Sequence, residues 1–116
     1  MTDAHKPAMT LTIAGSEATG GAGAQADLKT FQELGTFGIV ALTCIVSFDP
    51  KDDWNHRFVP VEPQTIADQI EATFANYGPE ALDTVKLGMM APPPPSPRSL
   101  PRLRIAARRT WCWTPC

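Results

Sequence analysis

Apolar residues gather along this chain in short blocks whose spacing predicts alternating strands and helices. Residues 9–14 form an apolar run typical of a buried strand, and residues 37–46 form a longer run that fits a strand covered on both faces. Between them, residues 22–34 carry apolar side chains at helical spacing, and Gly35 follows where a helix would end. The expected helical stripe consists of Ala22, Ala26, Thr30, Phe31 and Leu34. The chain therefore opens with a strand, a helix and a second strand.

The following pattern predicts a second set of elements. Residues 47–57 are polar and rich in turn formers, and residues 58–61 read as a short strand. Pro63 stands where a helix begins, and apolar positions at helical spacing continue to Tyr77, before a Gly-Pro pair. Residues 81–87 read as a last short strand. This order predicts an α/β layered fold whose central sheet is at least partly parallel.

The composition changes abruptly after Met90. All 12 acidic residues lie in residues 1–90, together with five of the ten basic residues, whereas residues 91–116 hold five arginines and no acid. The second segment also contains a run of four prolines and shows neither helical nor strand periodicity. We therefore divide the chain into a folded part, residues 1–90, and a Pro/Arg-rich tail, residues 91–116.

The tail has the properties of a shifted reading frame. Tryptophan has a single codon and cysteine only two, so the run TWCWTPC at residues 110–116 largely fixes its own codons. Read from the third base of each codon, the same bases encode an apolar residue followed by Val-Leu-Asp, a buried strand that ends in aspartate. We hypothesise that one base is missing near codon 91, through a natural deletion or a sequencing error. The alternative is a genuine Pro/Arg-rich tail.

A genuine tail would place the protein in another functional class, that of interaction modules. The prolines at 92–95 can adopt a polyproline II helix that binds an SH3-type groove, and the five arginines can bind nucleic acid. We favour the frame shift, because it produces such a composition without selection. We accordingly expect no nucleic-acid partner.

Other features of the sequence point to a cytoplasmic protein without a structural metal. Residues 1–6 lack an apolar signal segment, and no apolar run approaches membrane-spanning length, so we expect no membrane partner. Three cysteines do not form a disulfide framework. Asp49, Asp52 and Asp53 lie close in sequence, but their spacing fits no standard metal site.

The strand, glycine-rich loop and helix at residues 11–34 form the main candidate site. Such an arrangement brings backbone N–H groups and a polar side chain up to a small ligand. Its candidate residues are Gly15, Gly20, Gly21, Gly23 and Asp27. Taken alone, the glycines could form an ordinary loop and Asp27 could be a solvated helix residue.

The segment IAGSEATGGAGAQADLKTFQELGTFG, together with KLGMM at residues 86–90, resembles the opening of the hydroxymethylpyrimidine kinase and pyridoxine kinase group of the ribokinase-like superfamily. The usual pattern there is IAGSD-x-SGGAGIQADLKTF, with Glu17 here in place of aspartate and Thr19 in place of serine. The resemblance covers about residues 9–90. It implies the N-terminal part of a ribokinase-like αβα domain with a central, mostly parallel sheet.

Members of this group phosphorylate a hydroxymethyl group on a pyridine or pyrimidine ring, using ATP and Mg²⁺. The resemblance places Gly15 and Asp27 at the ring substrate, where the carboxylate would accept a hydrogen bond from the ring. It gives Gly20, Gly21 and Gly23 the role of a close-approach loop and mobile lid edge. A small-molecule substrate is the expected partner, and a homodimer is possible for the full-length protein.

Phe48 bears on the choice between the two substrates. It stands where the pyrimidine kinases have a glutamine, and a phenyl ring packs on a ring face but makes no amide hydrogen bonds. Trp54 and His56 resemble the W-x-H segment of Firmicute-type pyridoxine kinases, although alone they could be hairpin packing and a surface loop residue. We therefore favour a pyridoxine/pyridoxal kinase of vitamin B6 salvage. The alternative is a hydroxymethylpyrimidine/phosphomethylpyrimidine kinase of thiamine biosynthesis.

The resemblance also identifies what this chain lacks. In the family, the ATP-binding and catalytic elements lie in the C-terminal half and include a glycine-rich anion hole beside the catalytic base. No corresponding segment and no P-loop motif occur here. Lys86 could approach a phosphate or could be structural. We therefore expect no catalytic residue in this chain and predict that it is an inactive kinase fragment.

Overall fold

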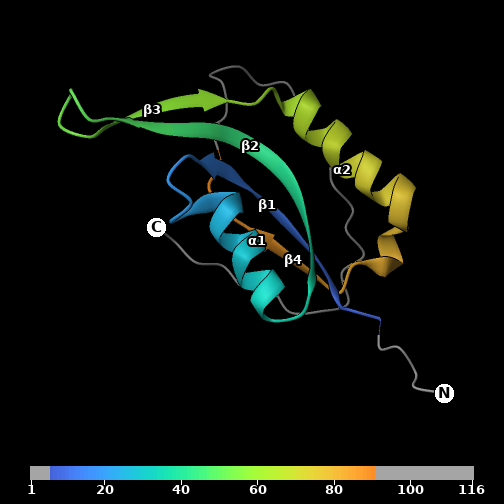
Figure 1. Cartoon of the computed structure of the whole chain (residues 1–116). Helices are drawn as coiled ribbons and strands as arrows, with labels where there is room; N and C mark the ends of the chain where they lie inside the picture. Colours follow the sequence, from blue (N-terminus) through green and yellow to red (C-terminus); the bar gives the residue numbers. More distant parts are fainter. Residues whose placement is uncertain (1–5, 91–116) are drawn as a thin grey trace.

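A computed structural model of the 116-residue chain describes residues 6–90. Its elements are β1 (Met9–Glu17), α1 (Gly23–Glu33), β2 (Phe37–Asp49), β3 (Asn55–Pro60), α2 (Pro63–Tyr77), the short 3₁₀ helix η1 (Pro79–Ala81) and β4 (Thr84–Leu87). The succession of strands and helices follows the order expected from the hydrophobic pattern (Figure 1). The predicted tail, residues 91–116, lies outside the described residues.

The strands form one sheet in the order β3-β2-β1-β4. Strand β1 pairs in parallel with both β2 and β4, whereas β3 returns antiparallel along β2. The prediction of a mostly parallel sheet is therefore confirmed. Strand β1 lies inside this sheet, and every residue of it except Ser16 is buried. This explains why its sequence is an apolar run rather than an alternating one.

The two longer helices cover opposite faces of the sheet. Leu11 and Ile13 of β1 pack in the core with Ile70 of α2. Thr12 lies between them in sequence and donates a hydrogen bond to Asp27 of α1. Because successive side chains of a strand point to opposite faces, α2 and α1 lie on opposite sides of β1. The result is the αβα layering expected from the resemblance, with the apolar core on the α2 side (Figure 1).

A bulge interrupts the pairing of β1 and β2. Ala14 pairs with Leu42 but Ser16 pairs with Ile45, so β2 contains one extra residue at this point. Both intervening residues of β2, one of them Cys44, are fully buried. A side chain at Gly15 would bring its Cβ within 2.5 Å of Cys44 Sγ. The packing of the two strands therefore requires glycine at position 15, independently of any ligand.

The β2–β3 hairpin is longer than the sequence predicts. Residues 47–57 were expected to be a turn, and that expectation is wrong at both ends, because β2 continues to Asp49 and β3 already begins at Asn55. The cross-strand pairs that extend it include Ser47 with Arg57 and Asp49 with Asn55. The hydrogen bonds between two strands are made by the backbone and do not require apolar side chains. The polar residues at the ends of β2 and β3 therefore extend the hairpin, although their sequence did not predict it.

The stripe expected on α1 is also partly wrong. Leu34 is 72% exposed, and the residue of α1 that is buried is Ala24. The helix lies close to β2 at Gly38, where an added Cβ would come within 2.6 Å of the Leu28 side chain and 2.9 Å of Phe31. Such close contact needs small residues rather than a broad apolar stripe. None of the helices within residues 6–90 is long and apolar enough to cross a membrane.

Candidate functional site

The loop between β1 and α1 is organised around the carboxylate of Glu17. One oxygen of Glu17 accepts the backbone N–H of Thr19 at 2.7 Å; the other accepts the Thr19 hydroxyl at 2.7 Å and the Gly21 N–H at 3.2 Å. The Thr19 hydroxyl, helped by these backbone N–H groups, lowers the pKa of Glu17 below its ordinary value of 4.5. The residue is only 7% exposed. The loop therefore encloses a fixed negative charge.

Two side chains of α1 tie the same loop to the helix. Gln25 donates to Ser16 Oγ at 2.6 Å and accepts the Glu17 N–H at 3.0 Å. Lys29 donates to the Gly20 carbonyl at 3.0 Å. Sequence reasoning did not single out Gln25 or Lys29. The available signal was their spacing of four residues, which places both on the helix face next to the loop.

The glycines of this loop have different structural roles. Gly20 and Gly23 have positive φ angles of 76° and 64°, which side chains rarely adopt. A Cβ at Gly23 would also collide with the carbonyl oxygen of Gly15. At Gly21, by contrast, the only nearby atom is Thr19 Oγ1, at an ordinary contact distance of 3.6 Å. At Gly23, the backbone of the loop therefore lies directly against the end of β1.

Asp27 lies in a charged cluster between α1 and the sheet. Lys86 Nζ lies 2.6 Å from both carboxylate oxygens, and the hydroxyl of Thr12 donates to Oδ2 at 2.6 Å. The Asp27 side chain is 13% exposed and that of Lys86 is 31% exposed. Thr12 and Lys86 are register partners on β1 and β4. Three elements therefore meet at one carboxylate.

Phe48 and His56 face each other across the hairpin. They are register partners on β2 and β3, and their rings lie 4.7 Å apart at an angle of 55°. Trp54 lies apart from this pair in the turn that joins the strands, with a positive φ of 59° and 64% exposure. Glu17 pairs with Val46, so the hairpin leaves the sheet beside the glycine-rich loop.

These groups gather at the carboxyl end of the parallel strands, where α/β sheets bind their ligands. The loop begins at the last residue of β1, and Lys86 is the last residue but one of β4. After β4, Gly88 donates to the Ile13 carbonyl at 2.8 Å, and the Met89 carbonyl accepts the Thr43 hydroxyl at 2.6 Å. The K-x-G-M segment therefore crosses the end of β1 to reach β2.

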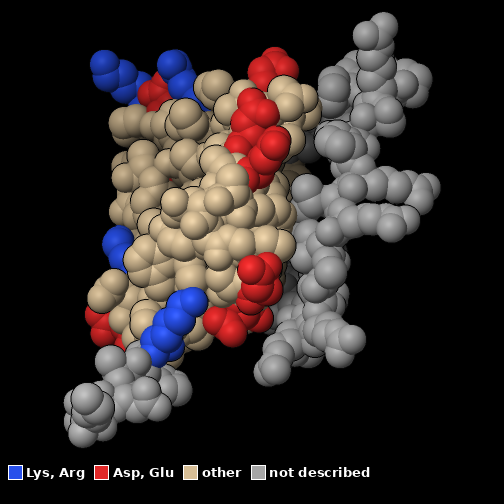
Figure 2. Space-filling view, turned by 90° about the vertical axis from the view of Figure 1, so that its right-hand side faces the viewer, with Lys and Arg blue, Asp and Glu red and all other residues tan. Residues whose placement is uncertain are grey.

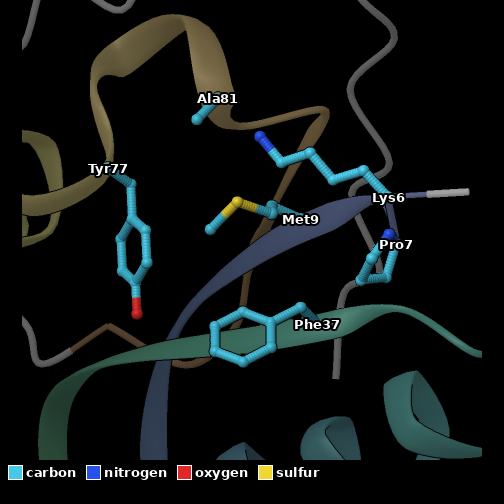
Figure 3. Close-up of a pocket in the computed structure, with 6 residues that line it drawn as sticks. All are labelled: Lys6, Pro7, Met9, Phe37, Tyr77 and Ala81. Carbon is cyan, nitrogen blue, oxygen red and sulfur yellow. The ribbon is translucent and has the colours of Figure 1, made fainter. Parts of the chain in front are cut away.

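A separate apolar pocket of about 280 Å³ opens at the other end of the sheet (Figure 3). It is lined by Lys6, Pro7, Met9, Phe37, Tyr77 and Ala81. Met9 and Phe37 begin their strands, and the Phe37 and Tyr77 rings meet edge to face at 6.0 Å. The pocket therefore lies far from the loop, Asp27 and Phe48, and it holds none of the predicted site residues.

Two of the three acidic side chains at the hairpin, Asp49 and Asp52, have partners of their own. Asp49 forms an ion pair with Arg57 at 3.0 Å, and Asp52 accepts a hydrogen bond from Asn55. Within residues 6–90, no three His, Cys, Asp or Glu side chains are grouped to hold a metal ion. On the face seen in Figure 2, the visible charged side chains of the described residues lie in small groups, some of which contain both signs, on a largely uncharged surface.

Comparison with known proteins identifies the class to which this fold and loop belong. The sequence model of the phosphomethylpyrimidine kinase family matches residues 17–94. A putative pyridoxine kinase of Treponema pallidum is 52% identical over 81 residues, covering 70% of this chain and 29% of the relative. A hydroxymethylpyrimidine/phosphomethylpyrimidine kinase of Escherichia coli is 40% identical over 81 residues, which are 70% of this chain and 29% of the relative.

Comparison with solved structures leads to the same family of kinases. The pyridoxal kinase of Staphylococcus aureus, in complex with AMP-PCP, superposes with a TM-score of 0.67 at 45% identity, covering 75% of this chain and 30% of that protein. The chain belongs to the phosphomethylpyrimidine kinase family, with the ribokinase-like α/β fold. It spans less than a third of the length of the relatives named here. The resemblance drawn from the motif is therefore confirmed, including its restriction to an N-terminal part.

Proposed function

We propose that this chain carries the ring-binding part of a cytoplasmic pyridoxine/pyridoxal kinase, an enzyme of vitamin B6 salvage. The observation that carries the proposal is Phe48, which stands where pyrimidine kinases have a glutamine and pairs with His56 beside the glycine-rich loop. An aromatic ring offers a flat apolar surface to a pyridine but none of the amide's hydrogen bonds. Asp27 supplies the acceptor for a polar group on the ring.

Phosphoryl transfer would need the part of the protein that lies beyond this chain. ATP and Mg²⁺ are the expected co-substrate and metal of the full-length protein, and its C-terminal half would supply the anion hole and catalytic base. Catalysis of this reaction consists mainly of positioning and electrostatics, so half of the machinery gives almost no rate. The 116-residue chain alone is therefore proposed to bind the ring and not to phosphorylate it.

A hydroxymethylpyrimidine/phosphomethylpyrimidine kinase of thiamine biosynthesis is the second candidate. It is favoured by the family whose model matches and by the relative from E. coli. The two candidates differ in what the residue at position 48 must do. A pyrimidine kinase would use this position for hydrogen bonds, and a pyridine kinase would use it for packing.

Calorimetric titration of the chain with pyridoxine and with hydroxymethylpyrimidine separates these candidates. We expect pyridoxine to bind more tightly, and we expect Phe48→Gln to shift the preference toward the pyrimidine. Phe58→Gln is the matched control, because Phe58 lies on the same face of the hairpin, two residues along β3 from His56. A wild-type preference for the pyrimidine would refute the pyridoxine assignment. Phosphorylated product formed by the chain with ATP and Mg²⁺ would refute the inactive-fragment proposal.

A further inference from the structure

The Asp27 carboxylate has most of its hydrogen-bonding capacity already in use. Lys86 contacts both oxygens, and Thr12 occupies a second position on Oδ2. A carboxylate offers roughly four acceptor positions, two on each oxygen. Among the described residues, the position that remains is one on Oδ1. Asp27 can therefore accept one further hydrogen bond, and only at that oxygen.

Lys86 is committed to Asp27 in a complementary way. Its ammonium group lies 2.6 Å from both carboxylate oxygens, so it holds Asp27 from both sides of the carboxylate. Lys86 is the more exposed partner, since its side chain is 31% exposed and that of Asp27 is 13% exposed. Lys86 therefore acts on this site mainly through its contacts with Asp27.

The position of the pair in the sheet makes this arrangement rigid. Lys86 and Thr12 are register partners on neighbouring parallel strands, so the backbone ladder fixes the distance between their Cα atoms. Thr12 is fully buried, which leaves its hydroxyl little freedom. Asp27 approaches from α1 on the side opposite the apolar core. A carboxylate held from three elements does not need a ligand to orient it.

We propose that Lys86 is a positioning residue which, with Thr12, orients Asp27 so that the remaining position on its Oδ1 accepts a hydrogen bond from a donor on the ring. This inference rests on the proposed function, since it assumes that Asp27 meets the ring. A ring hydroxyl on a pyridine is such a donor, and so is an amino group on a pyrimidine. The oriented carboxylate thus accepts either ring, and position 48 selects between them.

Binding of pyridoxine to the 116-residue chain tests the inference through four variants. We expect Lys86→Met to weaken binding by about tenfold or more, as the loss of a charge-assisted hydrogen bond predicts. Lys86→Arg should restore most of the affinity, because it keeps the charge and the donors. Asp27→Asn should be as harmful as Lys86→Met, and the double variant no worse than Asp27→Asn alone. Lys51→Met, at an exposed lysine of the hairpin turn, is the matched control.

Two further measurements separate positioning from simple support of the fold. Thr12→Val keeps the side-chain shape and the Asp27–Lys86 ion pair but removes one hydrogen bond to Asp27, so it should weaken pyridoxine binding. This variant still tests the inference if Lys86→Met does not fold. Pyridoxine methylated on its ring hydroxyl lacks the donor that Asp27 would accept, so it should bind the wild type more weakly than pyridoxine does. Its affinity for Asp27→Asn should equal its affinity for the wild type.

The outcomes distinguish this inference from the proposed function. Pyridoxine binding that Lys86→Met and Thr12→Val leave unchanged overturns the inference and leaves the proposed function standing. Strictly additive losses in Lys86→Met and Asp27→Asn overturn it as well, because independent residues do not couple. A folded wild-type chain that bound neither pyridoxine nor hydroxymethylpyrimidine would overturn both the inference and the proposed function.

Discussion

At the scale of single residues, the carboxylate of Glu17 is stabilised by the loop that surrounds it. Its lowered pKa means that the folded protein stabilises the ionised form. The corresponding stability is fully present above the ordinary value of 4.5 and is lost as the pH falls through the lowered pKa. We therefore expect Glu17→Gln to destabilise the chain near neutral pH and to matter progressively less as the pH falls below 4.5.

Urea unfolding of both proteins between pH 3 and pH 7 would measure this difference. Ser16→Ala is a useful control, because it removes a neighbouring hydrogen bond to Gln25 without removing a charge. Its effect should stay constant over the same range. A difference between wild type and Glu17→Gln that did not change with pH would show that the charge has no part in holding the loop.

Gly23 allows a second test on a single residue. Gly23→Ala must place a side chain at a φ of 64° and against the Gly15 carbonyl. Gly35→Ala has a similar φ of 70° but nothing within 4 Å of its Cβ, so it isolates the backbone term. We expect about 1–2 kcal/mol of destabilisation for Gly35→Ala. The overlap should add about 1–3 kcal/mol in Gly23→Ala.

The free energy of unfolding of the two alanine variants, measured in urea, provides the comparison. Equal losses would mean that the loop moves away from the end of β1 without cost. A larger loss in Gly23→Ala would show that loop and strand are packed as one unit.

The sequence could identify Asp27 as a candidate but not its surroundings. The long motif drew attention to this residue through family resemblance. The contacts of Asp27 could not be predicted from the sequence, because Thr12 lies 15 residues and Lys86 lies 59 residues away along the chain. Only the parallel pairing of β1 with β4 brings these two side chains to the same place. The threonines at positions 10 and 12, on either side of Leu11, were the local sign that this face of β1 is polar.

Among the elements, α2 was the easiest to predict and the hairpin the hardest. Proline at the first position and a clean helical period located α2, which runs from Pro63 to Tyr77 as expected. The bulge in β2 left no local signal, because the largely apolar run of this strand continues through it without a break. Hydrophobic spacing therefore predicted which elements exist, and long-range pairing decided their lengths.

Helix α2 should contribute more to stability than the hairpin does. Ile70 is 5% exposed and packs with Leu11 and Ile13, so Ile70→Ala should cost about 2–5 kcal/mol. Val59 of β3 is 58% exposed, and Val59→Ala should change the free energy of unfolding by no more than about 0.5 kcal/mol. Chemical denaturation of both variants tests this. Comparable losses would show that the hairpin belongs to the cooperative core.

For the whole molecule, the edge of the sheet at β4 is where a further strand would join. Among the described residues, β4 pairs with β1 and forms one edge of the sheet. The Val-Leu-Asp segment encoded in the shifted frame has the pattern of a buried strand ending in a polar residue. Such a strand could extend the sheet beside β4, which an edge at that position would readily accept.

Resequencing the gene across codon 91 tests the reading-frame hypothesis. We expect one additional base, after which the frame should continue through the Val-Leu-Asp strand into a glycine-rich second half. Expression of the restored gene should then yield a protein that transfers phosphate from ATP to pyridoxal. If the sequence stands unchanged, a sequencing error is excluded, and the remaining explanations are a natural deletion and a genuine tail at residues 91–116.

The extra residue in β2 has a consequence for which changes in chain length this strand can tolerate. Leu42 and Ile45 pair with residues of β1 that are two apart, so the bulge places both side chains on one face although they are three residues apart. Deleting one of the two residues between them would restore a regular ladder and leave Phe48 on its present face. Deleting Ser47, which lies beyond the bulge, would instead turn Phe48 and Asp49 to the opposite face. A lost codon is therefore tolerated at the bulge, whereas the same loss a few residues later turns the hairpin over.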